Sequence, residues 1–184
     1  MIASDSYRLP TNVKPITYDL VLTPYLENAT FQGEESIQIQ ILEDTSHITL
    51  NAAELKITNV TIALDSGAGL EATEIRTSEE AGTASFSFGK TLTPGNAVLK
   101  IRFSGRLNDQ LRGFYRCQYT TLTGEEAYLA VTQFEATDAR RAFPCWDEPA
   151  AKASFKVTLV VPSNLTAISN APIQEEIALD EDTK

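Results

Sequence analysis

The sequence predicts an all-β fold, an antiparallel saddle-like sandwich or large curved sheet with little helix. Apolar and polar residues alternate with a period of two along most of the chain, whereas no window of a dozen residues shows a 3.6-residue apolar repeat. Turn-forming residues such as Gly, Pro, Asn and Ser separate the alternating runs. Many short strands divided in this way are typical of antiparallel β architectures.

The alternating runs predict where the strands lie. The clearest run is Ile37–Ile41, where isoleucines alternate with glutamines, so that the isoleucines share one face. In a later run the alternation changes register around Asn59, which predicts a bulge or a bend. Ala127–Val131 is expected to be a buried strand. The predicted strands cover residues 16–23, 37–41, 55–64, 99–103, 127–131 and 155–161.

The last part of the chain has the pattern of an unfinished hairpin. Leu165, Ala167 and Ser169 alternate with other residues, and polar residues follow up to Lys184, as in the first arm of a hairpin and its turn. No returning strand follows in the sequence. We therefore expect a missing partner strand and an exposed sheet edge near the carboxyl end.

Charge and hydropathy exclude two classes of function. The 184 residues carry 25 acidic and 15 basic side chains, a formal net charge of −10 that repels phosphate backbones. Nucleic acid is therefore excluded as a direct ligand. No stretch reaches the roughly 18 uninterrupted apolar residues of a membrane span, so none is expected.

The first residues and the cysteines predict a cytoplasmic protein. Residues 1–6 show neither the basic start nor the apolar run of a targeting signal. Cys117 and Cys145 are expected to be free thiols in a reducing compartment. Glycosylation sequons begin at Asn28, Asn59 and Asn164, which keeps a secreted protein as the alternative.

The segment from Gln133 to Ala153, QFEATDARRAFPCWDEPAAKA, departs from the strand pattern. It follows the expected strand 127–131 and concentrates charge around an aromatic core. On the residues alone, Glu135 is expected to pair with Arg140 or Arg141 in a structural network. The same network is expected to include Asp138, Asp147 and Glu148. Phe143 and Trp146 are expected to anchor the segment in the hydrophobic core.

This segment resembles the signature of the aminopeptidase N family of zinc exopeptidases, and its sequence is most similar to that of the puromycin-sensitive branch. Further matches are Tyr7–Pro10, Pro15–Leu20 and Leu111–Tyr115, so the resemblance runs from about Tyr7 to Ile173. It implies that residues 1–184 form a single amino-terminal β domain of a larger aminopeptidase, which ends before its last strand. A separate catalytic domain, absent from this sequence, would bind zinc through a His-Glu-x-x-His helix and a further Glu.

The resemblance also implies a role for two residues. Gln133 and Glu135 match the family's Gln-x-Glu pair, which grips the first residue of the substrate. A carboxylate such as Glu135 is the natural partner of a free α-ammonium, and the amide of Gln133 can orient the ammonium and the first carbonyl. The expected partners are peptides with a free amino terminus and the protein's own catalytic domain.

No catalytic or metal-binding residue is expected within these 184 residues. Catalytic zinc needs three protein ligands, and the sequence contains one histidine, His47, which is expected to be an ordinary surface residue. Zinc is therefore the expected cofactor of the full-length enzyme only, and the fragment alone should cleave nothing. The alternatives are a non-catalytic β-sandwich scaffold for protein interaction and an extracellular carbohydrate-binding sandwich.

Overall fold

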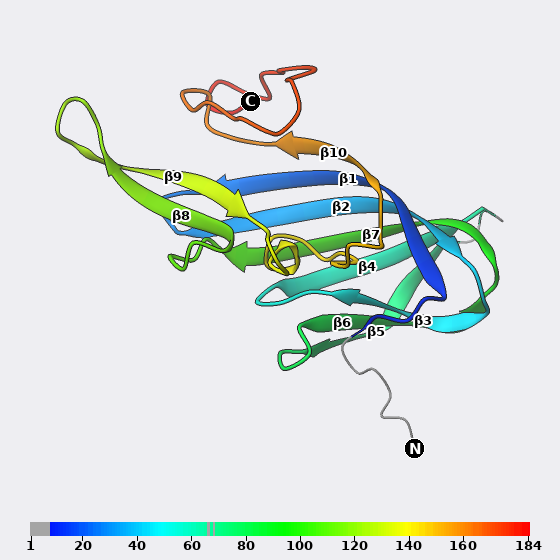
Figure 1. Cartoon of the computed structure of the whole chain (residues 1–184). Coiled ribbons are helices and arrows are strands. Elements are labelled where there is room, and N and C mark those ends of the chain that lie inside the picture. Colours follow the sequence, from blue (N-terminus) through cyan, green and yellow to red (C-terminus); the bar gives the residue numbers. More distant parts are fainter. Residues whose placement is uncertain (1–7, 66, 68) are drawn as a thin grey trace.

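The computed structural model describes residues 8–65, 67 and 69–184, and within them almost all regular structure is β-strand (Figure 1). A single 3₁₀ turn, η1, is the only helical element of this part of the chain. The elements, in order, are β1 (Val13–Tyr25), β2 (Thr30–Ile41), β3 (Thr45–Asn51), β4 (Lys56–Leu64), β5 (Gly69–Ser78), β6 (Thr83–Leu92), β7 (Gly95–Arg106), β8 (Gly113–Thr120), β9 (Glu126–Gln133), η1 (Ala139–Arg141) and β10 (Ser154–Leu159).

Eight of these strands form one strongly curled sheet in the order β10-β1-β2-β7-β4-β5-β6-β3. Strand β5 carries the curl, because Gly69–Glu71 pairs with β4 whereas Ala72–Ser78 pairs with β6. The sheet thereby folds over, with β3, β5 and β6 below β1, β2 and β7 in Figure 1. The predicted all-β, curved-sheet class is confirmed.

The hydrophobic core lines the concave side of this sheet. The isoleucines of β2 are at most 2 % exposed and the glutamines between them face solvent, as the alternation predicts. Leu50 of β3 and Phe86 of β6 close the core from the opposite layer and are fully buried. Each such side chain contributes about 1.5–3 kcal/mol by leaving water.

Strands β8 and β9 pair only with each other and form a separate two-stranded hairpin. The ring of Phe114 at the start of β8 packs edge to face on Phe31 of β2, with ring centroids 5.1 Å apart. The guanidinium of Arg116 donates to the carbonyl of Leu26 over 2.7 Å and lies 4.0 Å from the ring of Tyr128. These contacts fix the base of the hairpin on the turn between β1 and β2.

Several expectations about the strands are confirmed and others are wrong. The bulge at Asn59 is confirmed by a register shift between Ile57 and Asn59. The expectation that 127–131 is buried is wrong, since Leu129 in β9 is 39 % exposed. The reason is that β8 and β9 pair only with each other, and among the described residues no further strand extends their sheet. Residues 16–23, 37–41 and 99–103 lie within longer strands. The predicted strand 55–64 begins one residue before β4, and the predicted strand 155–161 continues two residues past the end of β10. The pattern did not single out β3, β5, β6 or β8.

The carboxyl end differs most from expectation. Residues 165–169 form no strand, and Pro162 and Thr183 pair in an isolated bridge that closes this segment as an irregular loop. One edge strand of the sheet is β10, and the other is β3. Strand β10 runs parallel to β1, because the connection from β9 through η1 returns the chain to the end of the sheet where β1 begins. Whether a partner strand is missing stays a prediction.

The remaining local expectations concern single residues. Cys117 and Cys145 are free thiols, and His47 is exposed near the start of β3, both as expected. Within the described residues, no helix is long and apolar enough to span a membrane.

Candidate functional site

Gln133 and Glu135 lie at the end of the β8–β9 hairpin, where β9 leads into the segment that precedes η1. Gln133 is the last residue of β9 and pairs with Gly113 of β8. Both Gln133 and Glu135 are exposed, whereas Phe134 between them is half-buried. The ring of Phe134 packs edge to face on Phe143, with centroids 5.9 Å apart. Phe134 therefore anchors the backbone that presents the two polar side chains to solvent.

A tight turn holds Glu135 in place. The backbone N–H of Asp138 donates to the carbonyl of Phe134 over 2.9 Å and closes a loop over residues 135–137. The peptide bond between Glu135 and Ala136 is cis. The chain then enters η1, in which the N–H of Arg141 donates to the carbonyl of Asp138 over 3.1 Å.

The aromatic part of the segment is anchored in the core, as predicted. Phe143 and Trp146 are 5 % and 8 % exposed. The backbone N–H of Trp146 donates to the hydroxyl of Tyr18 over 3.2 Å. Phe143 also packs edge to face on Tyr18 and Phe155, at 6.1 Å from each. The segment thus joins β1 and β10 to the loop that carries Glu135.

Asn51, which the sequence reasoning did not single out, attaches the same segment to β3. It is 3 % exposed. Its backbone exchanges two hydrogen bonds with Cys145, of 2.8 and 2.9 Å, and its Oδ1 accepts the N–H of Asp147 over 3.0 Å. Burial, followed by the Asp147 carboxylate, raises the pKa of the Cys145 thiol well above its usual value. Cys145 therefore stays protonated and acts by packing, not as a nucleophile.

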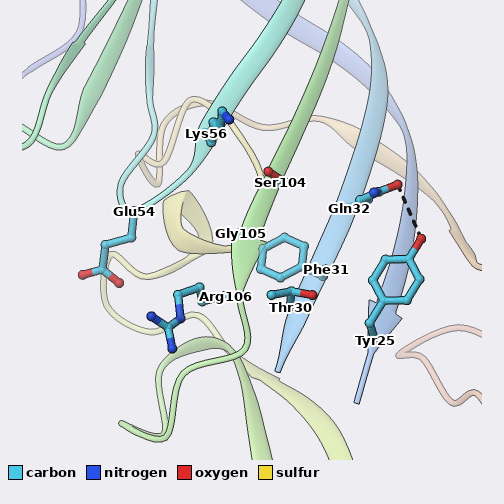
Figure 2. A pocket seen from close by; sticks show the side chains of 9 residues that line it. All are labelled: Tyr25, Thr30, Phe31, Gln32, Glu54, Lys56, Ser104, Gly105 and Arg106. Atoms are coloured by element: carbon cyan, nitrogen blue, oxygen red, sulfur yellow. Dashed lines mark hydrogen bonds between the residues drawn. The ribbon is translucent and has the colours of Figure 1, made fainter. Parts of the chain in front are cut away.

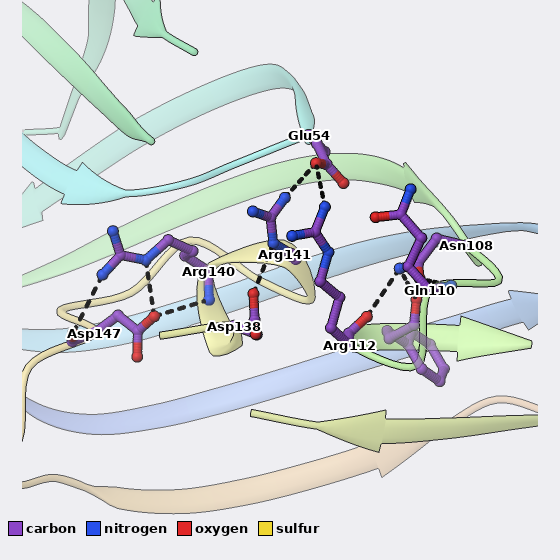
Figure 3. Close-up of polar contacts among 9 residues, drawn as sticks. Glu54, Asn108, Gln110, Arg112, Asp138, Arg140, Arg141 and Asp147 are labelled. Carbon is purple, nitrogen blue, oxygen red and sulfur yellow. Dashed lines mark hydrogen bonds and ion pairs between the residues drawn. The ribbon is translucent and has the colours of Figure 1, made fainter. Parts of the chain in front are cut away.

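The predicted network of acids and arginines is confirmed for four residues (Figure 3). Arg140 Nε donates to Asp147 Oδ2 over 2.9 Å, and its Nη2 reaches the Asp147 carbonyl at 3.4 Å. Arg141 Nε donates to Asp138 Oδ1 over 2.7 Å. All four side chains are at most 20 % exposed. Low exposure of charged groups is tolerated here because each group has a partner of opposite charge.

Glu148 differs from this expectation. Its Oε1 accepts the backbone N–H of Leu9 over 2.9 Å, so it holds the segment that leads into β1. This contact joins residues 139 positions apart in the sequence, and for that reason local pattern gave no sign of it.

The network extends to Glu54, in the connection between β3 and β4, which the sequence reasoning also missed. The Glu54 carboxylate pairs with Arg141 Nη1, and Arg112 Nη2 lies 3.7 Å from the same Oε1 atom. Burial opposes the charge of Arg141, but the hydrogen bonds that it donates to Asp138 and Glu54 outweigh burial and raise the pKa of the guanidinium. The only sequence feature near this contact is Leu111–Tyr115, one of the stretches that resemble the aminopeptidase N family.

Gly113 packs directly against Arg141. A Cβ built on Gly113 would lie 2.6 Å from Arg141 Cβ, and the φ of Gly113 is +66°. Both the close approach and the left-handed backbone favour glycine. Gly113 therefore brings the base of the hairpin, at Gln133, into contact with η1.

Glu135 itself takes no part in this network. Arg140 and Arg141, its expected structural partners, are paired with Asp147, Asp138 and Glu54. Across residues 8–65, 67 and 69–184, no ion pair or side-chain hydrogen bond involves Glu135 or Gln133. The arrangement therefore presents one exposed carboxylate and one exposed amide on a rigid support, a pair suited to a cationic group beside a carbonyl.

Gln133 and Glu135 belong neither to a metal site among the described residues nor to the hollow shown in Figure 2. Among the described residues, no group of three or more His, Cys, Asp and Glu side chains is arranged to hold a metal ion. An open hollow of about 390 Å³ lies over the ends of β2, β4 and β7 (Figure 2). Its lining includes Tyr25, Glu54 and Arg106, but neither Gln133 nor Glu135 borders it.

Comparisons with known proteins all indicate the same family. The model of the peptidase M1 N-terminal domain matches residues 14–184. Aminopeptidase M1 of Arabidopsis thaliana is 47 % identical over 172 residues, 92 % of this chain and 20 % of the relative. Aminopeptidase 2 of Candida albicans is 43 % identical over 177 residues, 96 % of this chain and 18 % of the relative. Puromycin-sensitive aminopeptidase of Caenorhabditis elegans is 40 % identical over 169 residues, 92 % of this chain and 18 % of the relative.

The chain thus spans about a fifth of the length of these relatives and matches them over nearly all of its own. The residues that match the family model include nearly all of the curled sheet and the segment that follows β9. This chain belongs to the peptidase M1 N-terminal domain family.

Proposed function

We propose that this chain is the amino-terminal, substrate-anchoring domain of a longer zinc metallo-aminopeptidase, which removes amino-terminal residues from peptides. Glu135 and Gln133 bind the free α-amine and the first residue of the substrate. The observation that supports this most is the exposed Glu135 carboxylate, which pairs with no described residue while both nearby arginines are engaged elsewhere. A structural acid in so dense a network would be paired.

The chemistry of amine recognition fits this position. A charge-assisted hydrogen bond between a carboxylate and an ammonium is worth about 1.5–3 kcal/mol. Gln133 adds a neutral donor and acceptor that can orient the amine and the first carbonyl. A rigid support holds the amine at a fixed distance from the reacting bond, which explains the removal of one residue at a time.

The zinc belongs to the part of the longer protein that lies outside these 184 residues. The donor set described above does not fit a catalytic zinc, so we assign no metal ligand and no catalytic residue here. In the longer protein the metal would supply an activated water. The contribution of this chain is confined to holding the substrate's amino end, next to a catalytic domain that it contacts as a partner. We place the protein in the cytoplasm, with secretion as the alternative.

The amine assignment is tested in the full-length protein with Glu135→Ala and Glu135→Gln. Removing a charged hydrogen bond of this strength should lower kcat/KM for an aminoacyl substrate with a free amine at least about tenfold. Glu135→Gln should resemble Glu135→Ala, because it keeps the size of the side chain and removes its charge.

Glu126→Gln is the matched control, since Glu126 is an exposed acid at the other end of β9. It should leave kcat/KM unchanged. Unaltered turnover by both Glu135 variants would overturn the amine assignment. A full-length protein that turns over no free-amine substrate at all would instead favour the second candidate, a non-catalytic β scaffold for protein interaction, which the exposed apolar side chains of β10 support.

A further inference from the structure

We propose that Glu54 is a positioning residue for the amine site: it holds Arg141, and through Arg141 it fixes the turn that carries Glu135. The link between Glu54 and the turn follows from the contacts alone. The consequence for substrate binding rests on the proposed function of Glu135.

The first contact joins the β3–β4 connection to η1. The Glu54 carboxylate accepts a hydrogen bond from Arg141 Nη1 and forms an ion pair with Arg112 as well (Figure 3). Glu54 itself has a left-handed backbone, with φ of +60°. The residue before it, Ala53, donates its N–H to the carbonyl of Arg140 over 2.9 Å. Glu54 therefore approaches η1 from a backbone that is already attached to it.

The second contact joins Arg141 to the turn. Arg141 Nε binds the carboxylate of Asp138 at 2.7 Å, and the backbone N–H of Asp138 closes the turn on Phe134. Asp138 is thus held by its side chain and by its backbone at once. Because Glu135 lies inside this turn, any loosening of Asp138 changes the direction of the Glu135 carboxylate.

A third contact reaches the other polar residue of the site. The Arg141 side chain packs on Gly113, and Gly113 is the cross-strand partner of Gln133. Arg112, the neighbour of Gly113, points at Glu54. Glu54 therefore steadies both the strand that ends at Gln133 and the turn that follows it.

The pairing of Glu54 differs from an ordinary surface ion pair. Exposed pairs such as Arg102–Glu34, 66 % and 51 % exposed, contribute about 0–1 kcal/mol. The Arg141 side chain is 19 % exposed and is shared by two carboxylates. Without Glu54, Arg141 keeps only Asp138 and gains freedom to move. Sites that act by orientation depend on such supporting contacts.

The test uses Glu54→Gln and Glu54→Ala in the full-length protein, with Glu34→Gln as the matched control. Kinetics with a free-amine substrate should show KM raised about threefold to tenfold and kcat within about twofold, the pattern of weakened binding. The backbone amide of Asp138 should exchange with deuterium about tenfold faster, since its hydrogen bond opens more often. Glu34→Gln should change neither quantity. Glu54 is 57 % exposed, so its variants should retain the fold.

Glu135→Ala separates this inference from the proposed function. In that background a Glu54 substitution should raise KM no further, because Glu54 acts through Glu135. Unchanged exchange at Asp138 in the Glu54 variants overturns the inference, whatever Glu135→Ala does. Additive effects on KM overturn it too, because Glu54 would then act by another route. Faster exchange together with a silent Glu135→Ala variant supports the link between Glu54 and the turn and overturns the amine assignment.

Discussion

Glu35 is a carboxylic acid buried completely in the core of the sheet. It lies on the isoleucine face of β2, between Leu20 of β1 and Ile101 of β7. Neither of its carboxyl oxygens has a hydrogen-bond partner among the described residues. Burial raises the pKa of Glu35 well above its usual value, so the folded protein keeps this group protonated at pH values where an unfolded chain has lost the proton.

This sets the sign of a pH dependence. Above the ordinary pKa of a glutamic acid the folded state binds more protons than the unfolded state, so stability falls as pH rises, until the folded-state pKa is passed. Glu35→Leu should remove this decline and raise the free energy of unfolding near neutral pH by about 1–3 kcal/mol, because it also removes an unsatisfied polar group. Urea unfolding at about pH 5 and about pH 8 measures both effects.

Glu34→Leu is the control for Glu35, since Glu34 is the exposed neighbour on the opposite face of β2. It should change stability little and leave the pH slope intact. If Glu35→Leu is less stable than the parent at both pH values, then Glu35 has a favourable role that burial alone does not explain.

At the scale of elements, the pairing of β2 with β7 depends on two glycines that face aromatic rings. Phe31 lies opposite Gly105, and Phe103 lies opposite Gly33. A Cβ on Gly105 would lie 2.4 Å from Phe31 Cζ, and one on Gly33 would lie 2.2 Å from Phe103 Cζ. The rings thus cover the space that glycine leaves, and Phe31 continues from there to Phe114 in the hairpin.

Gly105→Ala should therefore destabilise the domain by about 1–3 kcal/mol, since the ring of Phe31 must move out of a packed core. Thermal or urea unfolding measures the change. Gly89→Ala in β6 is the matched control, because its Cβ would meet only Thr73 Cγ2 at 3.4 Å. Equal stability of the two variants would show that the core yields to the added methyl group.

At the scale of the whole molecule, the sheet ends in an edge strand with exposed apolar side chains. Phe155 and Val157 of β10 are 53 % and 44 % exposed. The loop that follows β10 exposes more of them: Ile168, Ile173, Ile177 and Leu179 are 56–83 % exposed. Edge strands of this kind attract other chains.

Val157→Lys should accordingly lower self-association of the 184-residue chain at high concentration without reducing its stability, because a charged side chain on an edge strand opposes pairing. Sedimentation at several concentrations measures the average mass. Thr158→Lys adds the same charge to the opposite face of β10 and should have a smaller effect. A parent chain that stays monomeric at every concentration contradicts this expectation.

Strand β2 illustrates which features of the fold can be predicted from the sequence. The side chains of an extended strand alternate by local geometry, so the inward face of Ile37–Ile41 follows from sequence, and the same alternation places Glu35 on that face. Likewise, Gln133 and Glu135 are separated by one residue and share exposure. The class of fold is a local property of this kind, whereas the choice of Gln133 and Glu135 as candidate residues came from the family resemblance.

The support of the site is not local. Glu54 and Arg141 are 87 positions apart, Asn51 and Asp147 are 96 apart, and Tyr18 and Trp146 are 128 apart. No alternation or spacing fixes these contacts, because they depend on the curl of the sheet and on the return of the chain to β1. The β class and the inward-facing side chains follow from the order of the residues alone, since backbone geometry dictates both. The partners of Arg140 and Arg141 depend on the folded chain, because folding brings distant charges together and leaves Glu135 without a partner among them.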